Sequence, residues 1–316
     1  MGDGDSLRAD AGRPARLLAA TAPGRRPTVV SWTPPKTSIV IVTWQSGPDI
    51  VPCLDSIHSR HEFEVIVIDN ASTDDTRERL ARYRHLQVIA NKRNVGYARG
   101  NNQGLAVCRG EYVLLLNPDT KLEPGALDRL LDHLEANPEH TAVAPRLLNL
   151  NGTLQHSVHG LPTPATAFWE LTGLSLLFPR HRGIGRIRMA WFDYDRPGPA
   201  PQPMASCLLF RRQALTALGG FDERFPMLYN DVDLSKRMLD RGMVTWYLPD
   251  ARVVHARGTS TGKIKPRMLR EQYRSLIRYL ARHDRSGWFR LKALVLVPLA
   301  GFVLALRTLT WRLRRR

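Results

Sequence analysis

Acidic residues stand at three places where a strand ends or a helix begins. Asp231 and Asp233 lie one residue apart in the stretch "FPMLYNDVDLSKR", directly ahead of a helical pattern, while Asp69 and Asp119 each follow an apolar, strand-like run. A positioned carboxylate can accept a proton from a reacting hydroxyl, hydrogen-bond a nucleoside or bind a hard divalent cation. A structural interpretation competes at each position, because Asp also caps helices and stabilises turns.

Strand and helix patterns alternate from residue 38 to residue 148. Short apolar runs rich in β-branched residues predict strands buried on both faces, and most are followed by a segment with helical spacing. The predicted strands are "SIVIVTW", "FEVIVIDN", "LQVIA", "YVLLLNPD" and "TAVAPRLL". This alternation predicts an α/β fold with a doubly wound, mostly parallel sheet. Ligands of such sheets bind at the carboxyl ends of the strands, where Thr43–Trp44, Asp69–Asn70 and Asn117–Asp119 stand.

Composition divides the chain into three segments. Residues 1–36 are rich in Gly, Ala, Pro and Arg and are predicted to be disordered. Residues 37–262 form the predicted α/β domain, in which the Pro- and Gly-rich stretch 151–203 lacks periodicity and is typical of a substrate loop. Residues 263–316 form a basic and apolar helical tail. Three widely spaced cysteines fit no disulfide or metal pattern, which favours a reducing cytosol.

Most of the positive charge belongs to the tail. The formal net charge is +17, and residues 263–316 hold 15 Lys and Arg against two acidic residues. An anionic partner is therefore expected: nucleic acid, an anionic membrane or a phosphorylated substrate. A basic amphipathic pattern is followed by an uncharged run of 14 residues, 293–306, with Trp288, Phe289 and Trp311 on its flanks.

That uncharged run is shorter than the roughly 18–20 residues that span a bilayer. The tail is therefore interpreted as a helix that lies on, or dips into, an anionic membrane surface. The alternative is an ordinary core helix pair with a solvated basic end.

Two nucleotide-binding motifs are absent from the sequence. "TWQSGP" follows the first predicted strand in place of G-x-G-x-x-G, and no G-x-x-x-x-G-K occurs, so a dinucleotide dehydrogenase and a P-loop NTPase are both disfavoured. A nucleic-acid-binding protein is disfavoured as well, because the predicted sheet has no evident basic and aromatic platform. Its binding would fall steeply with salt and persist without metal.

An ordered set of motifs carries a resemblance to a known family. In chain order these are "VIVTWQS", "VIVIDNASTDDT", "NKRNVGYARGNNQGL", "YVLLLNPDT", "SCLLFRRQALTALGGFDERFPMLYNDVDLSKR" and "VVHARGTSTG". Together they resemble the inverting family 2 glycosyltransferases, in particular the bacterial rhamnosyltransferase branch, over residues 38–262. The stretch "RSGWFRLK" resembles that branch's actinobacterial cell-wall enzymes, which attach rhamnose to a lipid-linked acceptor.

The resemblance implies a GT-A fold with a nucleotide-binding half at about residues 37–150 and an acceptor half at about residues 151–262. It also implies a nucleotide-sugar site along the carboxyl edge of the sheet. The residues implied for this site are Thr43, Trp44, Asp69, Asn70, Asn94, Gly96, Asn102, Asn117, Arg257 and Lys263. Gly96 would allow a close backbone approach, and Arg257 or Lys263 would add positive charge near the leaving diphosphate.

The same resemblance implies a metal and a catalytic base. "NPD", Asn117–Asp119, stands where the family has an Asp-x-Asp motif, which leaves Asp119 as the main metal-facing carboxylate and His255 as its partner. A metal ion with so few protein ligands keeps coordination positions for diphosphate oxygens, as is usual for Mg²⁺ or Mn²⁺. Asp231 matches the general base, which takes a proton from an acceptor hydroxyl during a single in-line displacement. Asp233 is expected to be structural.

We therefore expect an inverting transferase that moves rhamnose from dTDP-rhamnose to a lipid-linked or cell-wall glycan acceptor. It would act as a peripheral protein at the cytoplasmic face of the cell membrane, without nucleic acid as a partner. A transferase for another sugar, such as galactofuranose, galactose or glucose, stays open, because the sequence does not settle the donor. A catalytically inactive, membrane-docked scaffold is a further alternative, since Asn117 replaces the first Asp of the metal motif.

Overall fold

The computed structural model describes residues 34–256, 265–284 and 287–313. The segment predicted to be disordered, 1–36, lies outside these residues except for its last three, and so do Arg257 and Lys263 of the implied site. The helices are α1 (Gly47–Asp55), α2 (Thr76–Leu80), α3 (Tyr97–Leu105), α4 (Ala126–Ala136), α5 (Pro164–Thr172), α6 (Leu174–Leu177), α7 (Arg212–Leu218), α8 (Asn230–Leu239), α9 (Lys265–His283) and α10 (Phe289–Leu313). The strands are β1 (Thr37–Thr43), β2 (Phe63–Asp69), β3 (Leu86–Ala90), β4 (Tyr112–Leu116), β5 (Thr120–Leu122), β6 (His140–Leu148), β7 (Val158–His159), β8 (Gly198–Pro199), β9 (Gln202–Pro203), β10 (Cys207–Arg211) and β11 (Val244–His255).

One mixed sheet forms the centre of the fold. Within the described residues it has nine strands, in the order β3-β2-β1-β4-β10-β6-β11-β5, with β8 paired to β11. β1 pairs in parallel with β2 and β4, β2 with β3, and β6 with β11, whereas β10 runs antiparallel between β4 and β6. The predicted α/β fold with a mostly parallel central sheet is confirmed. Thr43 and Asp69, the last residues of β1 and β2, are register partners, so these two predicted site residues meet at one edge of the sheet.

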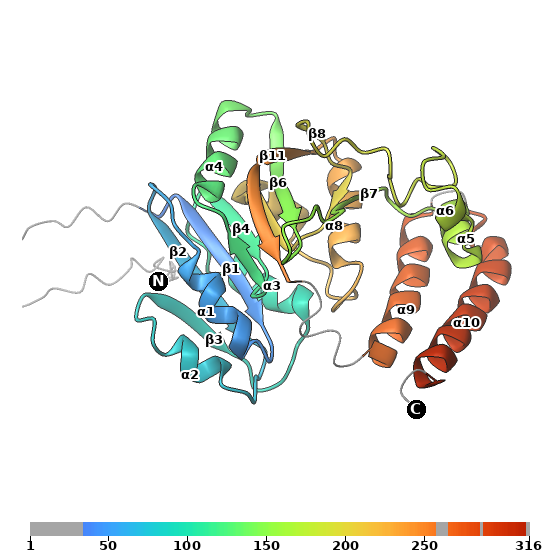
Figure 1. Cartoon of the computed structure of the whole chain (residues 1–316), viewed down its shortest axis with the longest axis horizontal. Helices are drawn as coiled ribbons and strands as arrows, with labels where there is room; N and C mark the ends of the chain where they lie inside the picture. Colours follow the sequence, from blue (N-terminus) through green and yellow to red (C-terminus); the bar gives the residue numbers. More distant parts are fainter. Residues whose placement is uncertain (1–33, 257–264, 285–286, 314–316) are drawn as a thin grey trace, which may run out of the picture. The chain divides into compact units, whose positions relative to one another are not determined.

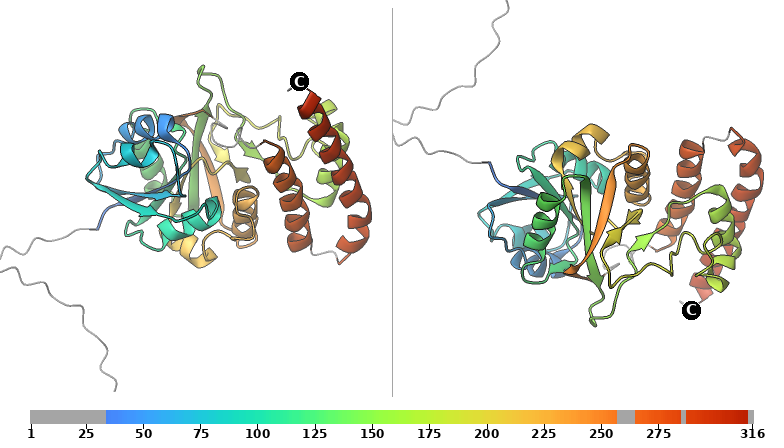
Figure 2. Two further views of the ribbon diagram at one scale, coloured as in Figure 1. Left: turned by 90° about the horizontal axis from the view of Figure 1, so that it is seen from below. Right: turned by 90° about the horizontal axis from the view of Figure 1, so that it is seen from above.

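Helices cover both faces of this sheet (Figure 1, Figure 2). Side chains alternate between the faces along each strand. In β1, Ile39 and Ile41 pack with residues of α1 and α4, whereas Val40 and Val42 pack with residues of α3, α7 and α8. A strand covered on both faces needs a continuous apolar run, which explains why the sequence of β1 does not alternate.

The stretch 151–203 is more ordered than its composition indicates. It contains α5, α6 and β8, and its strands β7 and β9 pair to form a separate two-stranded sheet. The side chain of Thr163 accepts a hydrogen bond from the N–H of Thr166 at 3.2 Å, and Pro164 fills the first helical position of α5. The prediction of an irregular segment is therefore wrong for this part, because nine-residue and two-residue elements leave no clear periodicity.

The tail forms two helices that pack against α5 and the loop ahead of α8. Tyr279 of α9 is buried in the same apolar cluster as Phe225, and Leu296 of α10 joins them. α10 has a 22-residue stretch, Phe289–Thr310, that is long and apolar enough to cross a membrane, and 11 % of its most apolar part is buried in the protein. The helix thus extends well beyond the 14-residue uncharged run, because it continues through charged residues at both ends.

Asp233 joins the tail to the main domain. Its buried carboxylate accepts a hydrogen bond from Nε of Arg237 at 2.7 Å, within α8. In α9, Nε2 of His283 lies 2.8 Å and Nε of Arg282 3.2 Å from the same carboxylate. No side chain caps the start of α8. The expected structural role of Asp233 therefore takes the form of a bridge between two helices.

Replacing Asp233 by Ala is expected to lower the free energy of unfolding by about 3–5 kcal/mol, because the largely buried side chains of Arg237 and His283 then lose the carboxylate that they contact. Denaturant unfolding measures this change. Asp195→Ala is the control, since the Asp195 side chain is 82 % exposed in its ion pair with Arg146, and such surface pairs contribute about 0–1 kcal/mol. A loss of less than about 1 kcal/mol at Asp233 would contradict the bridging role.

Candidate active site

The carboxyl edge of the sheet brings together residues from β1, β2 and the start of α3. Thr43 and Asp69 are both fully buried. The N–H of Asn70 donates to the carbonyl of Thr43 at 2.9 Å, and the side-chain amide of Asn70 donates to the carbonyl of Gly96 at 3.2 Å. Trp44 follows directly and is partly buried. The structure thus brings five of the predicted nucleotide-site residues to one place.

Asp69 is held in place by hydrogen bonds. Its carboxylate accepts from Nε of Arg77 and from the N–H of Ser72, the latter at 3.2 Å. Arg77 also donates to the carbonyl of Asn91 at 3.2 Å. A carboxylate has about four lone-pair positions, so Asp69 retains capacity to accept from a nucleobase N–H. Arg77 therefore fixes the orientation of the Asp69 carboxylate, and the motif did not single it out.

Gly96 approaches the backbone of another loop closely. Its φ is +89°, and a Cβ atom there would lie 2.8 Å from the carbonyl oxygen of Pro226. The N–H groups of Tyr97 and Ala98 donate to the same carbonyl at 2.6 and 3.2 Å. The loop ahead of α8 therefore supplies a hydrogen-bond acceptor for N–H groups of the first turn of α3, which have no partner within the helix. The side chain of Asn94 accepts from the N–H of Gly96 at 2.9 Å. Because glycine has no Cβ atom, the carbonyl of Pro226 can approach this position closely. The contact holds the start of α3 against the loop ahead of α8.

Asn102 lies outside this group. Its side chain donates to the carbonyl of Phe221 at 2.9 Å and accepts from the N–H of Phe221 at 2.8 Å. These bonds fasten α3 to the turn that follows α7. The geometry therefore gives Asn102 a structural contact, and its nucleotide-binding role stays a prediction.

Asp119, in the turn after β4, and His255, the last residue of β11, face one another. Nε2 of His255 lies 3.4 Å from Oδ1 of Asp119, and both side chains are largely buried. Nδ1 of His255 is 2.7 Å from Oε1 of Gln155, whose amide group also donates to Oδ1 of Asn149 at 3.0 Å. An amide oxygen only accepts, so in the neutral ring Nδ1 carries the proton and the lone pair of Nε2 faces Asp119.

Two acceptor atoms in a largely buried place favour a cation between them. Two ligands of one small divalent ion, each about 2.1 Å from it, stand roughly 3 Å apart, which fits the Asp119–His255 spacing. Oδ1 of Asn117, Oγ1 of Thr43 and Oγ of Ser206 are buried without a hydrogen-bond partner, as expected of groups that bind a ligand. Among the residues that the structure describes, no group of three or more His, Cys, Asp and Glu could hold a metal, so an ion here would share its coordination with substrate or water.

Replacing Gln155 by Leu is expected to weaken the affinity for Mn²⁺ about 10- to 100-fold, because His255 loses the partner that fixes its tautomer. Titration calorimetry in the presence of a nucleoside diphosphate measures this affinity. Gln87→Leu, at an exposed position of β3, provides the matched control and should bind Mn²⁺ as the wild type does. Equal affinity in the two variants would show that Gln155 does not support the site.

Asp231, the second residue of α8, faces the acceptor half. Its Oδ1 accepts from the N–H of Val232 at 2.9 Å, and its Oδ2 lies 3.4 Å from Nε2 of Gln202. Burial raises the pKa of Asp231 above its usual range, while backbone hydrogen bonds from Val232 and Ala205 act in the opposite direction. A raised pKa makes a carboxylate a better proton acceptor near neutral pH. The residue therefore has the properties of a general base.

A cavity of about 430 Å³ opens beside Asp231. Its walls come from α5, α9, α10, the two-stranded sheet and the residues ahead of α8, and this size suits a small organic group such as a sugar. Tyr229, another lining residue, has a φ of +66°. Residues other than glycine rarely adopt this conformation, and such residues cluster at functional sites.

Tyr97 lies near both carboxylate sites. Its hydroxyl donates to the carbonyl of Ala205 at 3.0 Å. Burial raises the pKa of Tyr97, and the negative charges of Asp231 and Asp119 raise it further. Because the charges of both carboxylates raise the pKa of the same phenol, Asp231 and the Asp119–His255 pair lie in one region of the protein.

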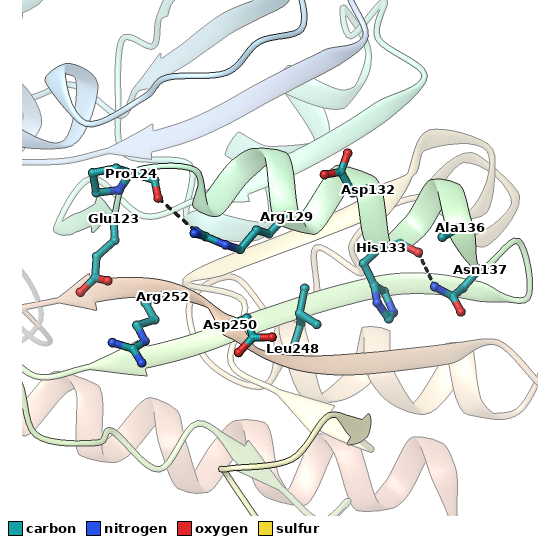
Figure 3. Close-up of a pocket in the computed structure, with 10 residues that line it drawn as sticks. All are labelled: Glu123, Pro124, Arg129, Asp132, His133, Ala136, Asn137, Leu248, Asp250 and Arg252. Carbon is teal, nitrogen blue, oxygen red and sulfur yellow. Dashed lines mark hydrogen bonds between the residues drawn. The ribbon is translucent and has the colours of Figure 1, made fainter.

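A larger cavity, of about 700 Å³, lies between α4 and β11 (Figure 3). Its lining mixes both signs of charge and includes Glu123, Arg129, Asp132, Asp250 and Arg252. Arg129 is already engaged there, since its guanidinium donates to the carbonyl of Pro124 at 3.0 Å. None of the predicted site residues lines this cavity, so it is not the candidate active site.

Comparison with known proteins shows which family the chain belongs to. Residues 38–197 match the family model described as Glycosyl transferase family 2. The N-acetylglucosaminyl-diphospho-decaprenol L-rhamnosyltransferase of Mycobacterium tuberculosis is 31 % identical over 271 residues, which cover 80 % of this chain and 86 % of that protein. The resemblance seen in the sequence is therefore confirmed.

Solved structures give the same fold. A mannosyltransferase from Pyrobaculum calidifontis, in complex with GDP-Man and Mn²⁺, has a TM-score of 0.54 at 19 % identity, over 87 % of this chain and 76 % of that chain. GalNAc-T7 with UDP, GalNAc and Mn²⁺ has a TM-score of 0.56 at 16 % identity, over 78 % of this chain and 48 % of that chain. At such identities the likeness shows the fold alone, and the expected GT-A fold is confirmed. The chain belongs to glycosyl transferase family 2 and is a nucleotide-sugar glycosyltransferase.

Proposed function

We propose that this enzyme transfers its sugar with inversion at the anomeric carbon and that Asp231 is the general base. The position of Asp231 carries the proposal: it is a carboxylate of raised pKa, it lines a cavity, and it has no cationic partner among the described residues. The acceptor oxygen forms its bond to the anomeric carbon while the bond to the nucleoside diphosphate breaks. The hydroxyl proton passes to Asp231, and one displacement inverts the configuration.

The other site residues bind and orient the donor. Thr43, Asp69 and Asn70 would contact the nucleoside at the edge of β1 and β2. Asp119 and His255 would hold Mg²⁺ or Mn²⁺, which when bound neutralises charge on the leaving diphosphate. The Mn²⁺ in both structural neighbours supports a divalent cation here.

The proposed donor is dTDP-rhamnose and the proposed acceptor is a lipid-linked sugar. The name of the mycobacterial relative, which covers most of both chains, supports this assignment. A donor with another sugar is the second candidate, because the structural neighbours were solved with GDP-Man and with UDP and GalNAc.

Donor turnover by the purified, detergent-solubilised enzyme tests this function. dTDP-rhamnose, UDP-galactose, UDP-galactofuranose, UDP-glucose and GDP-mannose are offered in turn with Mg²⁺ or Mn²⁺ and a membrane lipid extract. We expect nucleoside diphosphate release from dTDP-rhamnose only. Release from another donor alone would replace the rhamnose assignment, and release from none by folded protein would contradict the proposed reaction.

We further propose that the enzyme works at the cytoplasmic face of the membrane and docks through α10. Large apolar side chains of this helix are exposed, namely Leu291, Leu294, Val295, Val297, Phe302, Leu306 and Leu309. Exposed apolar patches of this kind mark interaction or membrane surfaces. Arg270, Arg274 and Arg278 are exposed on the neighbouring α9, and such basic residues attract anionic headgroups.

Leu294→Glu is expected to weaken binding to vesicles that contain anionic lipid by roughly tenfold or more, because a charge on the inserted face is costly. Co-sedimentation measures the bound fraction. Val88→Glu makes the same kind of change at an apolar side chain exposed on β3 and should leave binding unchanged. Equal binding of both variants would contradict docking through α10.

A further inference from the structure

The cavity beside Asp231 is closed by the C-terminal helices. Gln272, Tyr273 and Leu276 of α9 line it, and so does Arg307 of α10. Helices from the end of the chain therefore form part of the wall around the proposed base. A helix pair that served only for membrane attachment would not need to reach this cavity.

Arg307 is the one Lys or Arg among the described residues that line this cavity. It is exposed, and no described carboxylate pairs with it. It lies close to Tyr273: burial raises the pKa of Tyr273, and the positive charge of Arg307 acts in the opposite direction. The cavity thus has a cationic group available to an anionic ligand, and a guanidinium suits phosphate oxygens.

Glu170 of α5 supplies a second polar group to the same cavity. Its Oε2 accepts from Arg188 at 2.9 Å, while its Oε1 is buried without a hydrogen-bond partner. A buried, unpartnered carboxylate oxygen is costly unless a ligand donates to it. A sugar hydroxyl is a donor of this kind.

The helix that carries Arg307 also has an exposed apolar side. Phe302, Leu306 and Leu309 of α10 are exposed, and they fall on one side of the helix because residues three and four apart are neighbours. Arg307 lies on a different side of α10, the side that lines the cavity. A ligand with a sugar and a phosphate matches the polar groups of the cavity beside Asp231, and a hydrocarbon chain attached to it would find apolar surface on the same helix.

We propose that this cavity is the binding site for the head of a glycosyl diphosphate lipid, with Arg307 pairing with its phosphate and Glu170 accepting from its sugar. This proposal rests on the proposed function, since it assumes transfer to a lipid-linked acceptor. It assigns acceptor selection to α5 and α10, two elements outside the motifs of the nucleotide-binding half.

Transfer kinetics with two synthetic acceptors test the phosphate contact. One is an alkyl diphosphate ester of N-acetylglucosamine, and the other is the alkyl glycoside of the same sugar and chain length without phosphate. Arg307→Gln is expected to raise KM for the diphosphate acceptor about 10- to 100-fold and to leave KM for the glycoside and KM for the donor unchanged. Adding inorganic phosphate should compete with the diphosphate acceptor in the wild type only weakly, because it lacks the sugar and the chain.

Arg290→Gln is the matched control, because Arg290 is an exposed Arg of the same helix that does not line the cavity. It should leave both KM values unchanged. Glu170→Gln should raise KM for both acceptors, whereas Arg188→Gln, which removes the same ion pair but keeps the carboxylate, should have the smaller effect.

Equal KM changes for the two acceptors in Arg307→Gln, or no change, would overturn the phosphate contact while the wild type still transfers sugar. No transfer by the wild type to either acceptor, with donor hydrolysis also absent, would count against the proposed function itself. Calorimetry measures the binding of the diphosphate ester directly, in the absence of donor. It distinguishes failure of the phosphate contact from failure of the proposed function. An unchanged dissociation constant in Arg307→Gln would overturn the proposal independently of activity.

Discussion

Asp231→Asn is expected to lower the rate of sugar transfer by about 10²–10⁴-fold, because an amide cannot take the proton from the acceptor hydroxyl. The substitution keeps the shape of the side chain, and the N–H of Val232 can still donate to its carbonyl oxygen. Steady-state nucleoside diphosphate release measures the rate, and nucleotide binding should be unchanged. Asp250→Asn, at an exposed position of β11, should retain full activity. Substantial sugar transfer by Asp231→Asn would show that Asp231 is not the general base.

The same substitution is expected to stabilise the fold at neutral pH. Burial raises the folded-state pKa of Asp231 above its unfolded value, so between these two pKa values the folded state binds more protons than the unfolded state. The free energy of unfolding therefore falls as pH rises through that window, and the full cost of the buried charge is present above it. Asn carries no charge and avoids this cost. Denaturant unfolding at pH 5 and pH 8 should show the larger gain at pH 8.

The raised pKa of Asp231 also predicts the acid side of the activity profile. Protonated Asp231 cannot act as a base, so transfer should decline at a pH above the ordinary Asp value of about 3.9. The residual activity of Asp231→Asn should lack this decline. A decline of the same shape in both proteins would assign it to another group.

Asp119→Asn is expected to lower the rate of sugar transfer by about 10²–10⁴-fold. A divalent ion that neutralises charge on the leaving diphosphate stabilises the transition state by several kcal/mol, and the variant would lose this stabilisation. The neutral amide of Asn is a weaker ligand beside the imidazole of His255, 3.4 Å from Oδ1 of Asp119 in the wild type. Chelation of divalent ions should reduce the wild type to the level of the variant. Adding Mn²⁺ or Mg²⁺ back should restore only the wild type.

Metal binding gives a second readout for this prediction. In calorimetry with a nucleoside diphosphate present, Asp119→Asn should lose most of its Mn²⁺ affinity, whereas Asp231→Asn should keep it. Full wild-type activity in chelator would contradict a metal-assisted reaction. Unchanged Mn²⁺ affinity in Asp119→Asn would instead place the ion elsewhere in the protein.

The central sheet could be predicted from the sequence because its strands are covered on both faces. A continuous apolar run such as Ile39–Val42 indicates a strand whose two faces are both buried. The polar residues that follow such runs mark the carboxyl edge of the sheet, where ligands bind. Asp119 and His255 also followed from motif positions at strand ends. The structure places them face to face, as the resemblance implied.

Contacts between distant parts of the chain could not be read from sequence in the same way. Gln155 supports His255 from 100 residues away, and no motif marks it, because a glutamine in an irregular stretch has many possible roles. Asn102 stands in a motif with Gly96, but its partner is the backbone of Phe221, 119 residues further on. Arg307 is one basic residue among many in the tail, and only the folded position of α10 brings it to the cavity of Asp231.

The anomeric configuration of the product tests the account most directly. The accepted donor and the synthetic diphosphate acceptor are incubated with the wild-type enzyme, and the new glycosidic linkage is assigned by NMR. A single displacement with Asp231 as base predicts a configuration opposite to that of the donor. Retention of the donor configuration would require two displacements or a different route, and would contradict the role assigned to Asp231.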